Sequence, residues 1–288
     1  MKALENLIKT YYKITSPLFP KVTGRQAFNL FATTRRKKLN KREQAFYEEA
    51  EEIIVLHDSE DIRAYSLGPK DGSVIFLVHG WDSNAGSMAG IANLLVKQGF
   101  RVITFDLPAH GFSTLKKTNI RECAAVFQRV YEVFSRGEQV SVISHSFGSA
   151  VTTYGLSKME HDLKHLIFLT APDEIHDIFR EFSDFINLSE KAHQHMLGIA
   201  EDVIEEKLDD VAVHKIAPNL NFERFTMIHD QFDRILPYKY AEQIVSQIPN
   251  AEFITLEKAG HYKMLWNEEV NKAILERFDR SEEVVGML

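Results

Sequence analysis

The sequence is poor in cysteine: Cys123 is the only one in 288 residues. A single cysteine cannot form an internal disulfide, so the fold cannot depend on disulfide cross-links. Cys123 lies in a stretch with helical spacing, and we expect it to be buried as a packing residue. This cysteine usage predicts a cytoplasmic protein.

Long apolar runs are also missing. The longest are the length of a strand, well short of the roughly 18 residues that a membrane-spanning helix needs. The first residues include Lys2 but no unbroken apolar core and no small-residue cleavage site, so we expect no secretory signal. With 44% apolar residues, the chain is long enough to bury a full core. These features predict a globular protein without a membrane span.

The charge is unevenly distributed. The formal charge is −7, but residues 1–43 contain eleven Lys or Arg against two Glu, so this segment carries +9 and the rest −16. Nucleic-acid binding depends on cations clustered over a whole face, which an acidic body does not provide, so we expect no nucleic-acid partner. The basic segment is predicted to be a solvated arm or to contact an anionic membrane.

The arm, residues 1–50, is expected to be helical. Apolar residues that share one helical face predict an amphipathic helix over 2–14, which could dock on the body or on a membrane; they are Leu4, Leu7, Ile8, Tyr11 and Tyr12. Further helices are expected near 25–31 and 40–52. We expect the arm to be dispensable for chemistry.

Strand and helix patterns alternate after the arm. A hairpin is expected at 53–56 and 62–67 around Asp58-Ser59, because two alternating stretches flank a short polar turn. Strands then follow at 74–79, 101–106, 140–145, 165–170, 224–229 and 251–256, with helices near 86–98, 118–135, 146–158, 238–247 and 267–279. This order predicts an α/β fold with a doubly wound, mainly parallel sheet and ligands at the carboxyl ends of the strands.

The alternation is interrupted only between Pro172 and Glu223. This stretch carries apolar residues at helical spacing and predicts a small helical cap, residues 173–222, over a core formed by 51–172 and 223–288. Phe179 and Phe182 belong to its aromatic stripe. We interpret them as candidate walls of a substrate pocket, with plain core packing as the alternative.

Ser146 stands between a predicted strand, 140–145, and the helix that follows it. A serine on such a turn projects its hydroxyl above the sheet edge, beside the N–H groups at a helix N-terminus. The usual motif is Gly-x-Ser-x-Gly, and here the two glycine positions hold Ser144 and Gly148. Ser146 is therefore a candidate nucleophile.

Four other segments extend the pattern. They are VIFLVHGW at 74–81, FDLPAHGFS at 105–113, DRILP at 233–237 and AGH at 259–261. With the serine turn, the chain resembles the α/β-hydrolase family from about residue 50 to 280. It looks in particular like a group of bacterial cytosolic α/β-hydrolases without an assigned substrate, which also begin with an Arg-rich segment.

The resemblance implies a catalytic triad of Ser146, Asp233 and His261. In this arrangement the serine attacks an acyl carbonyl, the histidine moves the proton, and the aspartate orients the imidazole. It also implies an oxyanion hole formed by the backbone N–H groups of Trp81 and Phe147. No cofactor is expected.

Two other aspartates are alternatives to Asp233 as the acidic member of the triad. Asp173 follows one strand, and Asp230 follows the next, as Asp233 does. The position of Asp233 four residues before Pro237 favours it, while Asp230 is expected to cap the turn.

The remaining histidines are expected to have other roles. His79 and His110 should join loops, and His145 should pack or bond to a loop. Four more histidines fall in the cap: His176, His193, His195 and His214. We expect no metal site, since His193 and His195 project about 200° apart on a helix.

These features predict a serine hydrolase that cleaves carboxylic esters of small or medium, partly apolar acyl groups through an acyl-enzyme. The first alternative is a thioesterase or acyltransferase with the same triad, because only the acceptor or leaving group differs. A non-catalytic, ligand-binding protein of this fold is the second. The natural substrate and the oligomeric state do not follow from the sequence.

Overall fold

The structure, a computed structural model, describes residues 2–57 and 60–278. Three helices open the chain: α1 (Lys2–Thr15), α2 (Pro20–Phe31) and α3 (Lys41–Glu49). The second begins five residues earlier than predicted, because Pro20 occupies a first-turn position where its missing N–H costs nothing. The third begins at a capping box between Asn40 and Glu43.

One eight-stranded sheet forms the centre, in the order β1-β2-β4-β3-β5-β6-β7-β8. Its strands are β1 (Glu51–His57), β2 (Glu60–Leu67), β3 (Val74–Val78), β4 (Arg101–Phe105), β5 (Val140–His145), β6 (Leu163–Leu169), β7 (Phe222–Asp230) and β8 (Glu252–Leu256). β2 pairs antiparallel with both β1 and β4, and the other neighbours are parallel. The mainly parallel, doubly wound sheet and its hairpin are confirmed. The predicted turn, Asp58-Ser59, lies outside the described residues.

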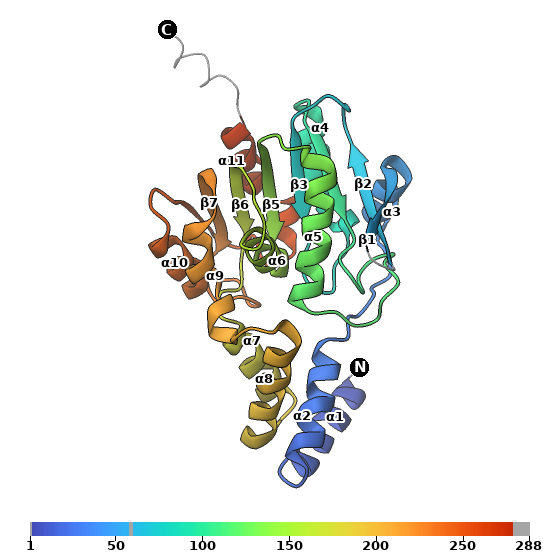
Figure 1. Cartoon of the computed structure of the whole chain (residues 1–288), viewed down its shortest axis with the longest axis vertical. Coiled ribbons are helices and arrows are strands. Elements are labelled where there is room, and N and C mark those ends of the chain that lie inside the picture. The colour runs from blue at the N-terminus through green and yellow to red at the C-terminus, as the bar shows by residue number, and fades with distance from the viewer. Residues whose placement is uncertain (1, 58–59, 279–288) are drawn as a thin grey trace.

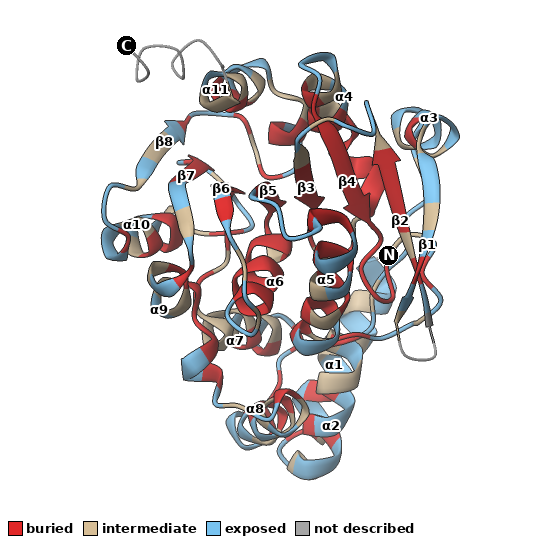
Figure 2. Ribbon diagram, turned by 45° about the horizontal axis from the view of Figure 1, so that its top comes forward, coloured by how far each residue is buried: buried red, intermediate tan, exposed pale blue. Residues whose placement is uncertain are grey.

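Helices cover both faces of the sheet (Figure 2). They are α4 (Ala89–Lys97), α5 (Ile120–Ser135), α6 (Phe147–Leu156), α10 (Tyr238–Gln247) and α11 (Glu268–Phe278). On β3, Phe76 and Val78 pack with the cluster that includes α5 and α6, while Ile75 and Leu77 pack with α4 and α11. The central strands are buried on both sides for this reason, as parallel strands usually are.

The interruption between β6 and β7 forms α7 (Ile175–Phe185), α8 (Glu190–Ile204), the 3-10 turns η2 (Leu208–Val211) and η3 (Ala217–Asn219), and the short helix α9 (Val213–Ile216). α1 and α2 lie beside α7 and α8 at the end of the molecule away from α4 and α11 (Figure 1). The division into arm, core and cap stays our proposal. In the structure the arm packs against the cap.

The contact between arm and cap is close. Ala27 of α2 and Ala192 of α8 are both fully buried, and the Ser16 hydroxyl accepts a hydrogen bond of 2.8 Å from the Ser189 N–H. α1 turns Tyr12 inward but leaves Leu4 exposed. No helix among the described residues is long and apolar enough to cross a membrane.

Candidate active site

Ser146 occupies a sharp turn between β5 and α6. Its backbone has φ 55° and ψ −126°, a region that residues with a Cβ rarely adopt. A Cβ on Gly148 would lie 2.4 Å from the Val78 carbonyl oxygen, so the helix can approach β3 only with glycine there. Ser144 replaces the usual glycine without distorting the turn, because its hydroxyl lies 2.7 Å from that of Thr152 on α6.

The three predicted catalytic side chains meet at the carboxyl ends of their strands. His261 Nε2 lies 3.0 Å from Ser146 Oγ, and His261 Nδ1 lies 2.8 Å from Asp233 Oδ2. The Nδ1–H that donates to Asp233 leaves the Nε2 lone pair facing the serine hydroxyl, which is the arrangement of a general base.

The environment of Asp233 keeps it ionised. Burial alone would raise its pKa, but the hydrogen bond and charge of His261 and the N–H groups of Ile235 and Leu236 lower the pKa below its ordinary value. Those two backbone groups donate to Oδ1 at 2.7 and 3.1 Å. Asp233 is therefore fixed in place and acts as an acceptor at neutral pH.

The two predicted oxyanion donors flank the serine. A Cβ on Gly80 would lie 3.1 Å from the Ser146 Cβ, so the segment that leads to Trp81 touches the nucleophile. Phe147 is the first residue of α6, where an N–H has no partner within the helix. The Trp81 and Phe147 rings meet edge to face at 5.0 Å.

Three buried histidines surround this arrangement without joining it. His79 Nε2 accepts the Leu107 N–H at 3.1 Å, and His110 donates to the Pro108 carbonyl at 2.8 Å. His145 Nε2 donates to the His261 carbonyl at 2.8 Å, which fixes the backbone of the proposed base. Burial lowers the pKa of His79 to about 4 and those of His110 and His145 to about 3. The expected loop roles are confirmed for His79 and His145, whereas the hydrogen bond of His110 stays within its own loop. All three are neutral at pH 7.

The alternative acids point elsewhere. Asp230 Oδ1 accepts the Phe232 N–H at 2.8 Å, and its other oxygen accepts the Gly260 N–H. Asp230 thus caps its own turn, as expected, and holds the loop that carries His261.

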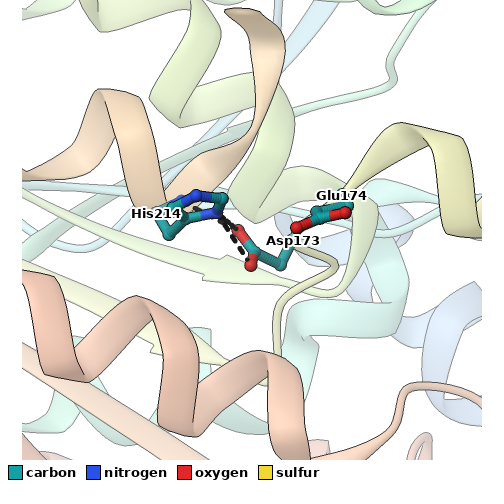
Figure 3. Close-up of side chains that lie close together, drawn as sticks. All are labelled: Asp173, Glu174 and His214. Carbon is teal, nitrogen blue, oxygen red and sulfur yellow. Dashed lines mark hydrogen bonds and ion pairs between the residues drawn. The ribbon is translucent and has the colours of Figure 1, made fainter. Parts of the chain in front are cut away.

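Asp173 pairs with a histidine of the cap (Figure 3). His214 Nδ1 lies 2.9 and 3.0 Å from the two Asp173 oxygens, and the His214 backbone N–H donates to Oδ1 at 2.8 Å. Burial raises the pKa of Asp173 despite these bonds. Asp173 therefore joins the end of β6 to α9 and does not reach His261.

Glu174 lies close enough to this pair for three ligand atoms to fall within 4.8 Å of one another, a grouping that could hold a metal ion. No local sequence pattern indicates this grouping, because His214 is 41 residues from Asp173. Each group already has a partner in the protein: His214 Nδ1 bonds to Asp173, and Glu174 accepts from Gln243 Nε2 at 3.2 Å. We interpret the three as a junction of cap and core.

An apolar cavity of about 280 Å³ opens at Ser146. Its walls come from α2, the segment after β3, α6, the cap and the loop after Asp233. The lining includes Phe28, Phe31, Trp81, Phe147, Ile175, Ile178, Phe179, Val203, Ile204, Leu208 and Ile235. Phe179 thus faces the cavity.

Phe182 does not line the cavity, so its assignment as a pocket wall was wrong. Its ring packs against Phe31 with centroids 5.2 Å apart, while Phe31 also contacts Phe179 at 4.6 Å. Both cap residues fall on one side of α7, but the arm inserts Phe31 in front of Phe182. The expectation that the arm is dispensable for chemistry also conflicts with this arrangement.

Sequence reasoning missed a second contribution of the arm. The Arg35 backbone N–H and Nε donate to the two Asp82 oxygens at 2.7 and 2.8 Å. Asp82 directly follows Trp81 and has a positive φ of 54°. Arg35 therefore anchors the segment that carries one proposed oxyanion donor. The acidic residue directly after His-Gly-Trp was the sequence feature that could have indicated a basic partner for this segment.

Comparisons with known proteins agree with this fold. A family model for the alpha/beta hydrolase fold matches residues 73–192. A serine hydrolase-like protein of Dictyostelium discoideum is 32% identical over 114 residues, which cover 38% of this chain and 32% of that protein. The chain thus spans about a third of that relative's length.

Solved structures share the fold at low identity. An esterase of Pyrococcus furiosus, Pf2001, superposes with a TM-score of 0.64 at 17% identity, over 86% of this chain and 98% of that one. A thioesterase domain from the curacin biosynthetic pathway gives 0.61 at 14% identity, over 80% and 99%. Together with the sheet order and the serine turn, these matches show that the chain has the α/β-hydrolase fold.

Proposed function

We propose that the protein is a serine hydrolase that cleaves carboxylic esters through an acyl-enzyme. The observation that carries this proposal is the hydrogen-bonded series Ser146–His261–Asp233, with contacts of 3.0 and 2.8 Å, at the opening of an apolar cavity. A buried carboxylate, an imidazole and a hydroxyl in this order make the hydroxyl a nucleophile at neutral pH.

Each proton and bond in the reaction has an assigned group. Ser146 Oγ bonds to the acyl carbon as its proton passes to His261 Nε2, and the oxyanion accepts from the Trp81 and Phe147 N–H groups. The bond to the alcohol oxygen then breaks, and His261 returns the proton to that oxygen. Water, activated by the same histidine, hydrolyses the acyl-enzyme. One oxyanion donor contributes about 3 kcal/mol in comparable sites.

The cavity favours small or medium apolar acyl groups. Most of its lining side chains are apolar, and Glu181 is the one carboxylate among them. Each methylene that the cavity removes from water is worth about 0.8 kcal/mol, roughly a fourfold gain. We therefore expect kcat/KM to rise with acyl length until the cavity is full.

Thioester hydrolysis or acyl transfer is the second candidate. The leaving group must lie on the side of His261, which protonates it. Next to that histidine, Tyr262 is half exposed, and the Lys37 ammonium lies 5.1 Å from its ring centre. A cation here favours leaving groups that bear negative charge, as phosphorylated thiol carriers do. A cytoplasmic setting and a small-molecule substrate complete the proposal.

The test is labelling with a fluorophosphonate followed by peptide mass spectrometry. Ser146 should be the labelled residue, and Ser146→Ala should abolish both labelling and ester turnover. Ser149→Ala is the matched control, because that hydroxyl lies on the same helix and only bonds to backbone carbonyls. Folded protein that carries the label elsewhere, or that neither labels nor hydrolyses any ester, would leave the non-catalytic, ligand-binding alternative.

Nitrophenyl esters and acyl thioesters, each from acetyl to dodecanoyl, separate the two catalytic candidates. Added alcohols and amines reveal acyl transfer by partitioning of the acyl-enzyme. We expect ester turnover to have a maximum at intermediate chain length. A preference for uncharged short acetyl esters alone would contradict the assignment of the cavity as the acyl site.

A further inference from the structure

α1 presents an apolar stripe to solvent. Leu4, Leu7 and Ile14 are 60–66% exposed and Tyr11 is 43% exposed. Their spacing of three, four and three residues puts them on one face of the helix. The adjoining face, with Tyr12, is the one that packs on the rest of the protein. The stripe therefore has no partner among the described residues.

The stripe continues into the turn and the start of α2. Leu18, Phe19 and Val22 are 57–68% exposed, and the Tyr11 hydroxyl donates to Gln26 Oε1 at 2.9 Å, which joins the two helices at this surface. We call these seven residues the hairpin surface: Leu4, Leu7, Tyr11, Ile14, Leu18, Phe19 and Val22. Single exposed apolar residues need no explanation, whereas a contiguous group marks an interaction site.

The hairpin surface is bordered by positive charge on α2. Between residues 2 and 31 there are five Lys or Arg and one Glu, and that Glu5 is paired with Lys9 at 2.6 Å. Lys21 and Arg25 are exposed on either side of Val22 along α2. Lys2 and Lys13 project from the opposite side of α1, about one helix diameter away, where salt at physiological strength already weakens their effect.

We propose that the hairpin surface docks on an anionic lipid membrane. An amphipathic helix with an apolar stripe and neighbouring cations lies in the plane of such an interface, with its apolar side chains between the headgroups and the acyl chains. Negative lipid headgroups complement Lys21 and Arg25. This inference does not depend on the proposed hydrolase activity.

A second copy of the chain is a less suitable occupant. In a two-fold contact the same surface faces itself, so Lys21 and Arg25 of one copy would approach those of the other without a carboxylate on the hairpin surface to neutralise them. The membrane supplies both the apolar interior and the opposite charge.

Docking of the hairpin surface would also place the cavity close to the membrane. α2 carries Val22 on the hairpin surface, while Phe28 and Phe31 of the same helix line the cavity. A docked molecule therefore holds its cavity beside the lipid acyl chains, and the sheet end with α4 and α11 points away (Figure 1).

Vesicle cosedimentation of the full chain tests the proposal. The protein should bind vesicles of phosphatidylcholine mixed with phosphatidylserine, bind pure phosphatidylcholine far less, and lose binding as salt is raised. Leu7→Gln with Leu18→Gln should weaken binding about tenfold or more, as should Lys21→Gln with Arg25→Gln. Turnover of a water-soluble ester and the circular dichroism spectrum should not change.

Matched controls come from surfaces outside α1 and α2. Leu56→Gln changes an equally exposed leucine on β1, and Lys97→Gln with Lys272→Gln removes the same charge from α4 and α11. Neither control should alter vesicle binding. Absence of binding to the anionic vesicles, or equal losses in test and control variants, overturns the proposal. It is also overturned if sedimentation shows a dimer that Leu7→Gln with Leu18→Gln converts to a monomer, which would assign the surface to a second copy.

Discussion

Acid should destabilise the fold well before its carboxylates titrate, because several histidines are buried in the neutral form. His79, His110 and His145 are almost completely inaccessible, and burial lowers their pKa values to about 4, 3 and 3. A histidine in the unfolded chain has a pKa of about 6.5. Between these values only the unfolded state binds the proton, so stability falls as pH falls.

The size of the effect follows from the linkage relation. From pH 7 to pH 5 each such histidine should lower the free energy of unfolding by about 2 kcal/mol. Three of them amount to about 6 kcal/mol, a large part of the 5–15 kcal/mol of a typical domain. Asp106 and Asp173 act in the opposite direction, since burial raises their pKa values. The difference between wild type and a histidine variant cancels these contributions.

The assay is urea unfolding followed by circular dichroism at pH 7 and pH 5. His110→Asn keeps a donor for the Pro108 carbonyl but removes the titrating ring, so its loss of stability from pH 7 to pH 5 should be smaller than that of the wild type by about 2 kcal/mol. Ile103→Val is the control: it should cost about 1 kcal/mol equally at both pH values. Equal losses in His110→Asn and wild type would refute the reasoning.

Three further predictions concern the site. Asp233→Asn should lower kcat about 10⁴-fold by disturbing the His261 tautomer, whereas Asp173→Asn should lower kcat at most about tenfold. The reverse order in ester assays would assign the acidic member of the triad to Asp173. Arg35→Ala should lower kcat about tenfold, less than the loss of a whole oxyanion donor, with KM little changed and partial recovery in Arg35→Lys; an effect on KM alone would contradict its role through Asp82. Phe31→Ala should shift the preferred acyl chain to greater length in the nitrophenyl series, and an unchanged optimum would remove the ring from the cavity wall.

The core of the fold could be predicted because its signals are local. Alternating apolar runs and helical spacings define the strands and helices one at a time, and the alternation of strand and helix implies a parallel sheet. Ser146, Asp233 and His261 each follow a strand end, so the topology alone brings them to one edge of the sheet.

The arm could not be placed in this way. The apolar residues of its first helix were expected on one face, but in the structure that face divides into an exposed side with Leu4 and a buried side with Tyr12, and periodicity cannot say which side turns inward. The position of Phe31 in front of Phe182 depends on α2 packing against α8, a contact between segments far apart in the chain. No local pattern reports such a contact.

The double role of α2 bears on how proteins of this fold can diversify. One helix contributes Phe28 and Phe31 to the cavity and Val22 to the outer surface, and it lies outside residues 73–192, which match the family model. Exchange of this hairpin between relatives would replace the acyl-chain wall and the outer surface in a single event, while the serine turn and its histidine stay intact. Classification by the core would then group together enzymes that differ both in the acyl chains they accept and in the surface on which they dock.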